Sequence, residues 1–237
     1  MSITNTPALT LIEDELELLA SLVPLPGAQL IELGCGAARL SADLVGRFAA
    51  AHVTALEVDQ RQMAKNLAAP AVPGLDFVEA GAQAIPFAAS RFDGALMLKS
   101  LHHVPIGLMA QALSEVARVL KPGGWLYVSE PVYDGPLNEI MRLFNDEGVV
   151  RAAAQQVLDT ALQTGLWQAA GERYFEMPVQ FADFATFEQR MMRPTYADHA
   201  IDATLHETIR QRFESHLGPQ GVVLTRPMHV RLLRKAA

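Results

Sequence analysis

Hydrophobic positions along the first half of the chain alternate between two spacings. Short apolar runs typical of buried strands occupy Gln29–Leu33, 52–58, Leu75–Glu79, 93–99 and 125–129. Between them, apolar residues recur every three or four positions, as at Leu40, Leu44 and Phe48, which predicts helices. Strand and helix alternate five times. This alternation predicts a parallel sheet covered on both faces, with ligands bound at the carboxyl ends of the strands.

The regular alternation does not extend to the two ends of the chain. The spacing of Leu9, Ile12 and Leu16 predicts an amphipathic helix over 9–23. The pattern after Glu130 predicts helices over 137–144 and 149–166, a strand over 173–179, a mostly helical segment over 181–217 and a last strand over 222–233. We expect one domain over 1–237, with a cofactor-binding core at about 25–130 and substrate cap elements at about 1–24 and 131–217.

Composition narrows the class of protein. The chain has 237 residues, of which 50% are hydrophobic, so it can bury a full core. Its one cysteine, Cys35, cannot form an internal disulfide, and no cysteine and histidine cluster has zinc-ligand spacing, so we expect a cytoplasmic protein without a metal. The formal charge of -7 disfavours a nucleic-acid partner, and no apolar run is long enough to span a membrane. We expect a small-molecule partner, and a homodimer is compatible with the sequence.

A glycine loop follows the first predicted strand. Gly34, Cys35 and Gly36 come directly before a predicted helix, and glycines let a ligand approach the backbone closely. A dinucleotide site would need a third glycine at position 39, where this chain has Arg39. Glu32 before the loop suits a ligand that carries an ammonium group, such as S-adenosylmethionine. An NAD(P)-dependent oxidoreductase of Rossmann type remains the alternative.

The stretch 31–40 closely resembles the first motif of class I S-adenosylmethionine-dependent methyltransferases, with Ala38 where the family usually has glycine. Glu57, at the end of the second strand, matches the family's acidic residue that binds both ribose hydroxyls, and Val58 follows it. Asp59 is the second candidate for this role, although we favour it as the N-cap of the next helix.

The segment 77–87 resembles the family's adenine-binding loop. The family often has an aspartate where this chain has Gly81, so the resemblance implies that Gln83 supplies the acceptor or that adenine contacts backbone, with the Ala82 N–H as a partner. Segments 92–104 and 120–124 also match. The resemblance implies an α/β, doubly wound, seven-stranded sheet of order 3-2-1-4-5-7-6, with strand 7 antiparallel and helical cap insertions.

Several residues near the fourth strand are candidates for chemistry. Methyl transfer to a hydroxyl needs a general base, and His102 and His103 follow the strand that ends near the cofactor. The alternative is that they shape the loop, one of them buried and hydrogen-bonded. Lys99 either lies near the cofactor carboxylate or extends to solvent, and Cys35 serves as a small apolar residue of the cofactor loop.

Three residues after the fifth strand, Tyr133, Asn138 and Arg142, are candidates to face the acceptor, with helix packing as the alternative. The chain lacks the Asn/Asp-Pro-Pro-Tyr/Phe motif of amino-group nucleic-acid methyltransferases and the acidic cluster of the metal-dependent catechol type. We therefore expect methyl transfer from S-adenosylmethionine to the oxygen, nitrogen or carbon of a small molecule, with S-adenosylhomocysteine as product. A protein that binds the cofactor without catalysis is a further hypothesis.

Overall fold

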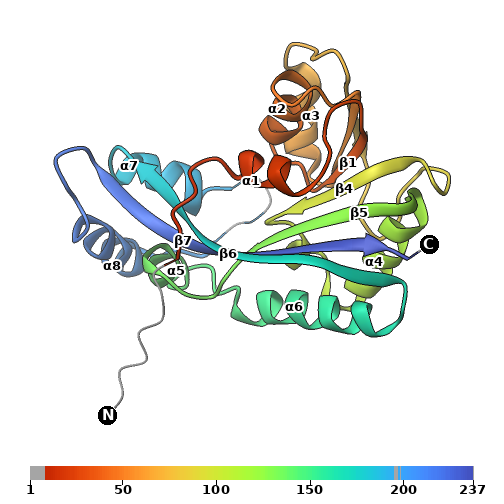
Figure 1. Ribbon diagram of the computed structural model, residues 1–237. Helices are drawn as coiled ribbons and strands as arrows, with labels where there is room; N and C mark the ends of the chain where they lie inside the picture. Colours follow the sequence, from red (N-terminus) through yellow and green to blue (C-terminus); the bar gives the residue numbers. More distant parts are fainter. Residues whose placement is uncertain (1–8, 195–196, 198, 237) are drawn as a thin grey trace.

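The structure, a computed structural model, describes residues 9–194, 197 and 199–236. Its strands form one seven-stranded sheet of order β3-β2-β1-β4-β5-β7-β6 (Figure 1). All neighbours pair in parallel except β7, which is antiparallel to β5 and β6. The predicted fold class, strand order and antiparallel strand 7 are confirmed. The strands are β1 (Gln29–Leu33), β2 (His52–Glu57), β3 (Leu75–Glu79), β4 (Phe92–Leu98), β5 (Leu120–Pro131), β6 (Trp167–Phe181) and β7 (Val222–Lys235).

Helices cover both faces of the sheet. Figure 1 shows α1, α2 and α3 on one face, α4 and α6 on the other, and α5, α7 and α8 together beyond one end of the sheet. The helical elements are α1 (Glu15–Leu22), α2 (Arg39–Gly46), α3 (Gln60–Ala68), η1 (Leu101–His103), α4 (Ile106–Val119), α5 (Pro136–Met141), α6 (Gly148–Gln163), α7 (Phe184–Phe187), η2 (Glu188–Met192) and α8 (Ala203–Glu214).

Alternate residues of each strand enter different apolar clusters. In β1, Ile31 and Leu33 pack in the cluster that contains α4 and α6, whereas Leu30 packs in the cluster that contains α1 and α2. Side chains alternate between the two faces of a strand, so both faces of the sheet are apolar and both are covered. Burying one such side chain stabilises the fold by about 1.5–3 kcal/mol.

A third cluster joins α5, α7 and α8 to the outer ends of β6 and β7. Aromatic rings form its centre, with the Phe187 centroid 5.2 Å from that of Phe181 and 4.9 Å from that of Phe213. Helix α6, which lies in the predicted cap range, instead packs on the sheet through Ala154 and Leu158. The division into core and cap stays a prediction.

The helix predicted over 9–23 begins only at Glu15, so this prediction was wrong for its first six residues. The side chain of Asp14 caps α1 by accepting from the backbone N–H of Leu16 at 3.0 Å. Before it, the N–H of Ile12 donates to the carbonyl of Glu176 at 2.8 Å, and the N–H of Glu176 donates to the carbonyl of Thr10 at 2.9 Å. Apolar spacing does not reveal that the edge strand β6 offers unpaired backbone groups to this segment.

The second half of the chain contains more strand than the sequence predicted. Strand β6 has 15 residues, and it pairs with β7 along almost its full length. The sequence predicted only residues 173–179 of this strand, because exposed polar residues such as Gln168 and Glu172 interrupt the apolar pattern at the edge of the sheet. Among the described residues of the segment 181–217, the helical ones are those of α7, η2 and α8. No helix within the described residues is long and apolar enough to cross a membrane.

Candidate active site

The loop between β1 and α2 forms a cradle at the carboxyl end of the sheet. Gly34 has φ +75° and Gly36 has φ +53°, a left-handed conformation that glycine adopts readily. The N–H groups of Gly34 and Cys35 both donate to the carbonyl of Leu56 at 2.9 Å, which ties the loop to β2. A Cβ on Gly34 would lie 2.8 Å from the Cβ of Ser100, so only glycine fits there.

Glu57 holds the cradle from the end of β2. Its Oε2 accepts from the N–H of Gly36 at 2.8 Å, and its Oε1 accepts from the N–H groups of Val58 at 2.8 Å and Asp59 at 2.9 Å. A carboxylate offers about four acceptor positions, so three of them are occupied. Both positions on Oε1 are filled and one on Oε2 is free, so a ribose diol that bound both oxygens would have to replace the N–H of Val58 or Asp59. Asp59 itself caps α3 by accepting from the N–H of Arg61 at 3.0 Å, as expected.

Glu32 lies buried beneath the cradle. Its carboxyl accepts a hydrogen bond from the hydroxyl of Ser41 in α2. Burial raises the pKa of Glu32 from 4.5 to about 7, although the Ser41 hydroxyl and the nearby charge of Lys99 act in the opposite direction. A carboxyl group with such a pKa gains or loses its proton near neutrality, so a cation placed beside it would favour the charged form.

Lys99 directly follows β4 and adopts a left-handed backbone conformation with φ +57°. Its Nζ lies 3.2 Å from Oε2 of Glu15, which is buried at the start of α1. The hydroxyl of Tyr127 donates to the other oxygen of Glu15 at 3.3 Å. Lys99 thus attaches α1 to the carboxyl end of the sheet, beside Glu32.

The loop after β3 carries the two residues expected near adenine. Ala82 is buried, and the side-chain amide of Gln83 folds back over Gly81. A Cβ on Gly81 would lie 2.6 Å from Nε2 of Gln83 and 2.8 Å from its Cδ. Val58 on the neighbouring strand end is 63% exposed, which makes it an apolar surface facing solvent. Arg39 is exposed at the first position of α2.

The two histidines have different surroundings. His102 is buried, and its Nδ1 pairs with the carboxylate of Glu130, which is fully buried in β5. The same carboxylate accepts from the N–H of Leu101 at 2.9 Å. His103 is exposed, with its ring centroid 4.1 Å from that of His102. Partial removal from water and the neighbouring His102 lower the pKa of His103.

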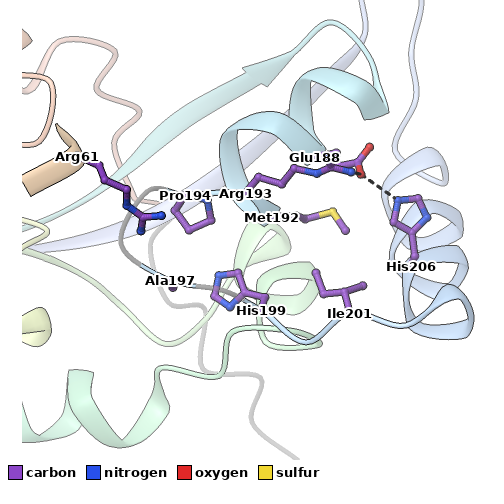
Figure 2. Close-up of a pocket in the computed structure, with 9 residues that line it drawn as sticks. All are labelled: Arg61, Glu188, Met192, Arg193, Pro194, Ala197, His199, Ile201 and His206. Carbon is purple, nitrogen blue, oxygen red and sulfur yellow. Dashed lines mark hydrogen bonds and ion pairs between the residues drawn. The ribbon is translucent and has the colours of Figure 1, made fainter. Parts of the chain in front are cut away.

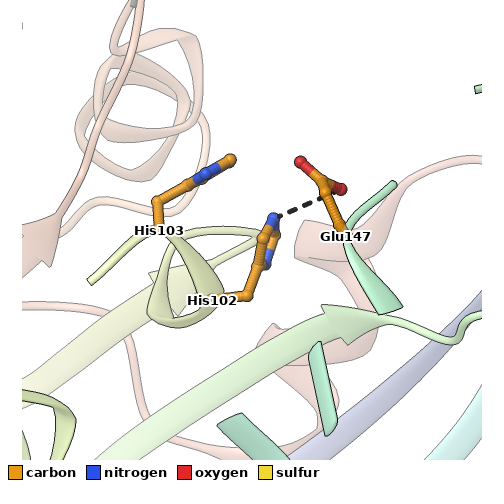
Figure 3. A group of neighbouring side chains, drawn as sticks. All are labelled: His102, His103 and Glu147. Carbon is orange, nitrogen blue, oxygen red and sulfur yellow. Dashed lines mark ion pairs between the residues drawn. The ribbon is translucent and has the colours of Figure 1, made fainter. Parts of the chain in front are cut away.

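Glu147 completes this group, and the sequence did not single it out. It is the residue before α6, and its Oε2 lies 3.8 Å from Nε2 of His102. Figure 3 shows Glu147 opposite the two histidine rings. Arg151, one turn into α6, donates to the same oxygen at 2.6 Å. The start of α6 and η1 are far apart in the sequence, and the fold brings them together. In the sequence, Glu147 is marked only as a carboxylate next to a predicted helix.

The three residues expected to face the acceptor occupy the connection between β5 and α6. Asn138 is buried, and its Oδ1 accepts from Nη1 of Arg151 at 3.0 Å. The Tyr133 hydroxyl donates to Asp146 at 2.7 Å, and the exposed Arg142 pairs with Glu139 at 3.3 Å. Asn138 therefore belongs to the same network as Glu147, whereas Tyr133 and Arg142 lie at the surface.

A cavity of about 430 Å³ opens between Arg61 of α3 and the segment from η2 to α8, a site that the sequence did not predict. Figure 2 shows Arg61 on one side and the paired side chains of Glu188 and His206 on the other, 3.3 Å apart. The lining combines cations with apolar surface. It consists of Arg61, Glu188, Met192, Arg193, Pro194, Ala197, His199, Ile201 and His206.

Residues 31–128 match the family model described as a methyltransferase domain. Over 112 residues the chain is 34% identical to the fatty-acid O-methyltransferase of Mycolicibacterium smegmatis, a match that covers 46% of this chain and 40% of that protein. It is 33% identical over 135 residues to an O-methyltransferase of Pyrenophora dematioidea, covering 55% of this chain and 49% of that protein. These matches span less than half the length of the two relatives.

Solved structures extend the likeness of fold to almost the whole chain. The YcgJ protein of Bacillus subtilis superposes with a TM-score of 0.63 at 16% identity, covering 93% of this chain and 97% of that one. The [4+2]-cyclase SpnF superposes with a TM-score of 0.61 at 19% identity, covering 93% and 80%. The strand order, the glycine cradle and the match of residues 31–128 to a methyltransferase domain make the chain similar to class I S-adenosylmethionine-dependent methyltransferases.

Proposed function

We propose that this protein transfers a methyl group from S-adenosylmethionine to an oxygen atom of a small molecule. The observation that carries the proposal is the cradle in which Glu57 binds the backbone of the glycine loop beside the buried Glu32. The two relatives described above are named as O-methyltransferases, and one of them as acting on a fatty acid, which supports oxygen as the acceptor atom.

Each part of the proposed cofactor has a residue in or beside the cradle that suits its chemistry. Glu32 provides a carboxyl group for the ammonium, Glu57 an acceptor for the ribose hydroxyls, and Gln83 an amide for the adenine. When bound, S-adenosylmethionine supplies a methyl group already activated on a sulfonium centre. The protein then has to position the acceptor and exclude water. We propose that the cofactor also contacts Gly34, Cys35, Gly36, Arg39, Val58, Ala82 and Lys99.

The histidine pair is the proposed group for acceptor activation. Ser100 packs against Gly34 of the cradle and directly precedes η1. His102 and His103, which belong to η1, therefore lie close to the cradle. Glu130 holds the ring of His102 through Nδ1, which leaves Nε2 for the side on which Glu147 lies. Such a ring can accept the proton of an acceptor hydroxyl. Tyr133, Asn138 and Arg142 are proposed to shape the acceptor side.

Two alternative functions make different predictions for ligand binding. An NAD(P)-dependent oxidoreductase would bind a pyrophosphate at the start of α2, where Arg39 replaces the third glycine of a dinucleotide loop. A non-catalytic protein would bind S-adenosylmethionine and transfer nothing. We propose a cytoplasmic enzyme that acts on a metabolite and has neither a nucleic acid nor a membrane as its partner. The mass of the protein in solution tests whether it forms a homodimer.

One experiment separates the three hypotheses. The full chain is titrated with S-adenosylmethionine and with NADP, and it is then incubated with methyl-labelled cofactor and a metabolite extract. The proposal predicts binding of S-adenosylmethionine alone and label in an organic-soluble product that alkaline hydrolysis or ether cleavage releases. Binding without any labelled product would support the non-catalytic hypothesis. Binding of NADP alone would overturn the assignment.

A further inference from the structure

We propose that His102, His103 and Glu147 bind a divalent transition-metal ion, and that Zn²⁺ is the ion their donor set fits best. One potential ligand atom from each residue lies within 4.8 Å of the others, and Figure 3 shows the three side chains converging. Ligands of a tetrahedral Zn²⁺ lie about 2.0–2.1 Å from the metal, hence roughly 3.3 Å apart. The 3.8 Å between Nε2 of His102 and Oε2 of Glu147 is close to that spacing.

Glu130 prepares His102 for this role. A histidine that binds a metal through one nitrogen usually donates from the other to a carboxylate, which fixes the tautomer and the ring orientation. The Nδ1 of His102 pairs with the fully buried carboxylate of Glu130, and Nε2 is the atom that faces Glu147. Glu130 is held in turn by the N–H of Leu101, so the ring has little freedom to turn away.

The local charge favours a cation. Glu130 and Glu147 carry two negative charges, and Arg151 offsets one of them. Arg151 donates to Oε2 of Glu147 through Nη2 at 2.6 Å and Nε at 3.2 Å, while Nδ2 of Asn145 donates to Oε1 at 3.0 Å. Each carboxylate oxygen accepts about two bonds, so Arg151 fills Oε2, whereas Oε1 keeps a position for a metal. Arg151 and Asn145 hold that carboxylate towards His102.

The donor set and the exposure of the site indicate the kind of ion and its use. Two imidazoles and one carboxylate suit Zn²⁺, whereas Mg²⁺ and Ca²⁺ prefer oxygen ligands. His103 is exposed to solvent, so a fourth ligand can enter, as in catalytic zinc sites. An acceptor hydroxyl on the metal would release its proton to solvent more readily, and the two rings would then act as ligands in place of a base. Metal binding by the chain does not depend on the proposed methyl transfer.

The test is a titration of the full chain with Zn²⁺ in competition with a chromophoric chelator, after dialysis against a strong chelator. We expect one equivalent to bind. The variants His103→Ala and Glu147→Gln should weaken binding at least tenfold, and Glu130→Gln should weaken it by about 10–100-fold. His229→Gln is the matched control, because His229 also pairs with a carboxylate, that of Glu172 at 2.6 Å, but no third potential ligand joins them among the residues that the structure describes.

A second readout identifies the ligands directly. Co²⁺ in the same site should give visible absorption bands of a four-coordinate ion, and these should disappear in His103→Ala, an exposed position whose change spares the core. The proposal is overturned if no Zn²⁺ binds, if affinity is unchanged in His103→Ala and Glu147→Gln, or if His229→Gln weakens it equally. Cofactor titration of the metal-free chain, run in parallel, tests the methyltransferase proposal separately.

Discussion

The side chain of Gln83 occupies the space beside Gly81 in which the methyltransferase family often places an aspartate. A Cβ at Gly81 would lie 2.6 Å from Nε2 of Gln83, so an acidic side chain there and the present position of Gln83 exclude each other. The amide of Gln83 is half-buried at the carboxyl end of β3. In the proposed adenine site, the amide of Gln83 would serve as the acceptor in place of the aspartate.

Removing the Gln83 side chain should therefore weaken cofactor binding. We expect Gln83→Ala to raise the Kd for S-adenosylmethionine by about 2–10-fold, the effect of one hydrogen bond lost. Isothermal titration calorimetry measures the change. Adding Gly81→Asp to that variant should recover most of the affinity, since the aspartate can then enter the vacated space. A double variant that binds no better than Gln83→Ala would contradict this account of the loop.

Glu57 should contribute more to binding than Gln83 does. It orders the cradle through three backbone N–H groups and provides the proposed ribose contact, so Glu57→Ala should raise the Kd at least about tenfold. The matched control is Glu79→Ala, because Glu79 ends the neighbouring strand β3 and accepts at the surface from the side-chain amide of Gln60 at 2.8 Å. Equal affinities of the two variants would mean that β2 does not carry the ribose site.

The raised pKa of Glu32 predicts a pH dependence of stability. Between pH 4.5 and about pH 7, the carboxyl group of Glu32 keeps its proton in the folded protein and loses it in the unfolded chain. Protonation therefore stabilises the fold below 4.5, and this contribution is lost as the pH rises through about 7. For a shift of this size the loss amounts to about 3 kcal/mol. Thermal unfolding over this pH range should show it.

Two variants isolate the contribution of Glu32. In Glu32→Gln, stability should fall much less between about pH 5 and about pH 8 than in the wild type. Glu214→Gln, which alters an exposed carboxyl group, should show the same fall as the wild type. Cofactor binding near neutral pH should also release a proton, because an ammonium beside Glu32 favours its charged form. Calorimetry in buffers with different ionisation enthalpies measures that proton. Identical pH profiles for wild type and Glu32→Gln would contradict the assignment.

The histidine pair should affect turnover and not cofactor affinity. With an acceptor identified, His102→Ala and His103→Ala should each lower kcat by about 10²–10⁴-fold, the usual contribution of acceptor activation. Their Kd for S-adenosylmethionine should change by less than about twofold. His216→Ala, at an exposed position in the turn after α8, is the control and should retain full turnover. Full activity in both active-site variants would assign these histidines a purely structural role.

The sequence predicted the first half of the fold well because its signals are local. Strand β1 and strand β3 begin and end where the apolar runs do, and the cradle follows from glycines at fixed positions. Asp59 was also identified as a cap, since capping depends on residues two or three positions away. These features need no knowledge of distant parts of the chain.

Long-range contacts account for what the sequence missed. The pairing of residues 10–12 with β6 and the full length of the β6–β7 hairpin depend on strand partners far apart in the chain. Glu147 and Glu130 reach His102 from two other elements, so no spacing near the histidines indicates them. Arg142 is the opposite case. It follows β5 closely in the sequence, which suggested a place facing the acceptor, but its side chain is exposed.

The most direct test of the central claim is the affinity of the purified full chain for S-adenosylmethionine and for NADP, measured by calorimetry for wild type and Glu57→Ala. We predict saturable 1:1 binding of S-adenosylmethionine by wild type, at least about tenfold weaker binding by Glu57→Ala, and no binding of NADP. Binding of NADP without binding of S-adenosylmethionine would contradict the account.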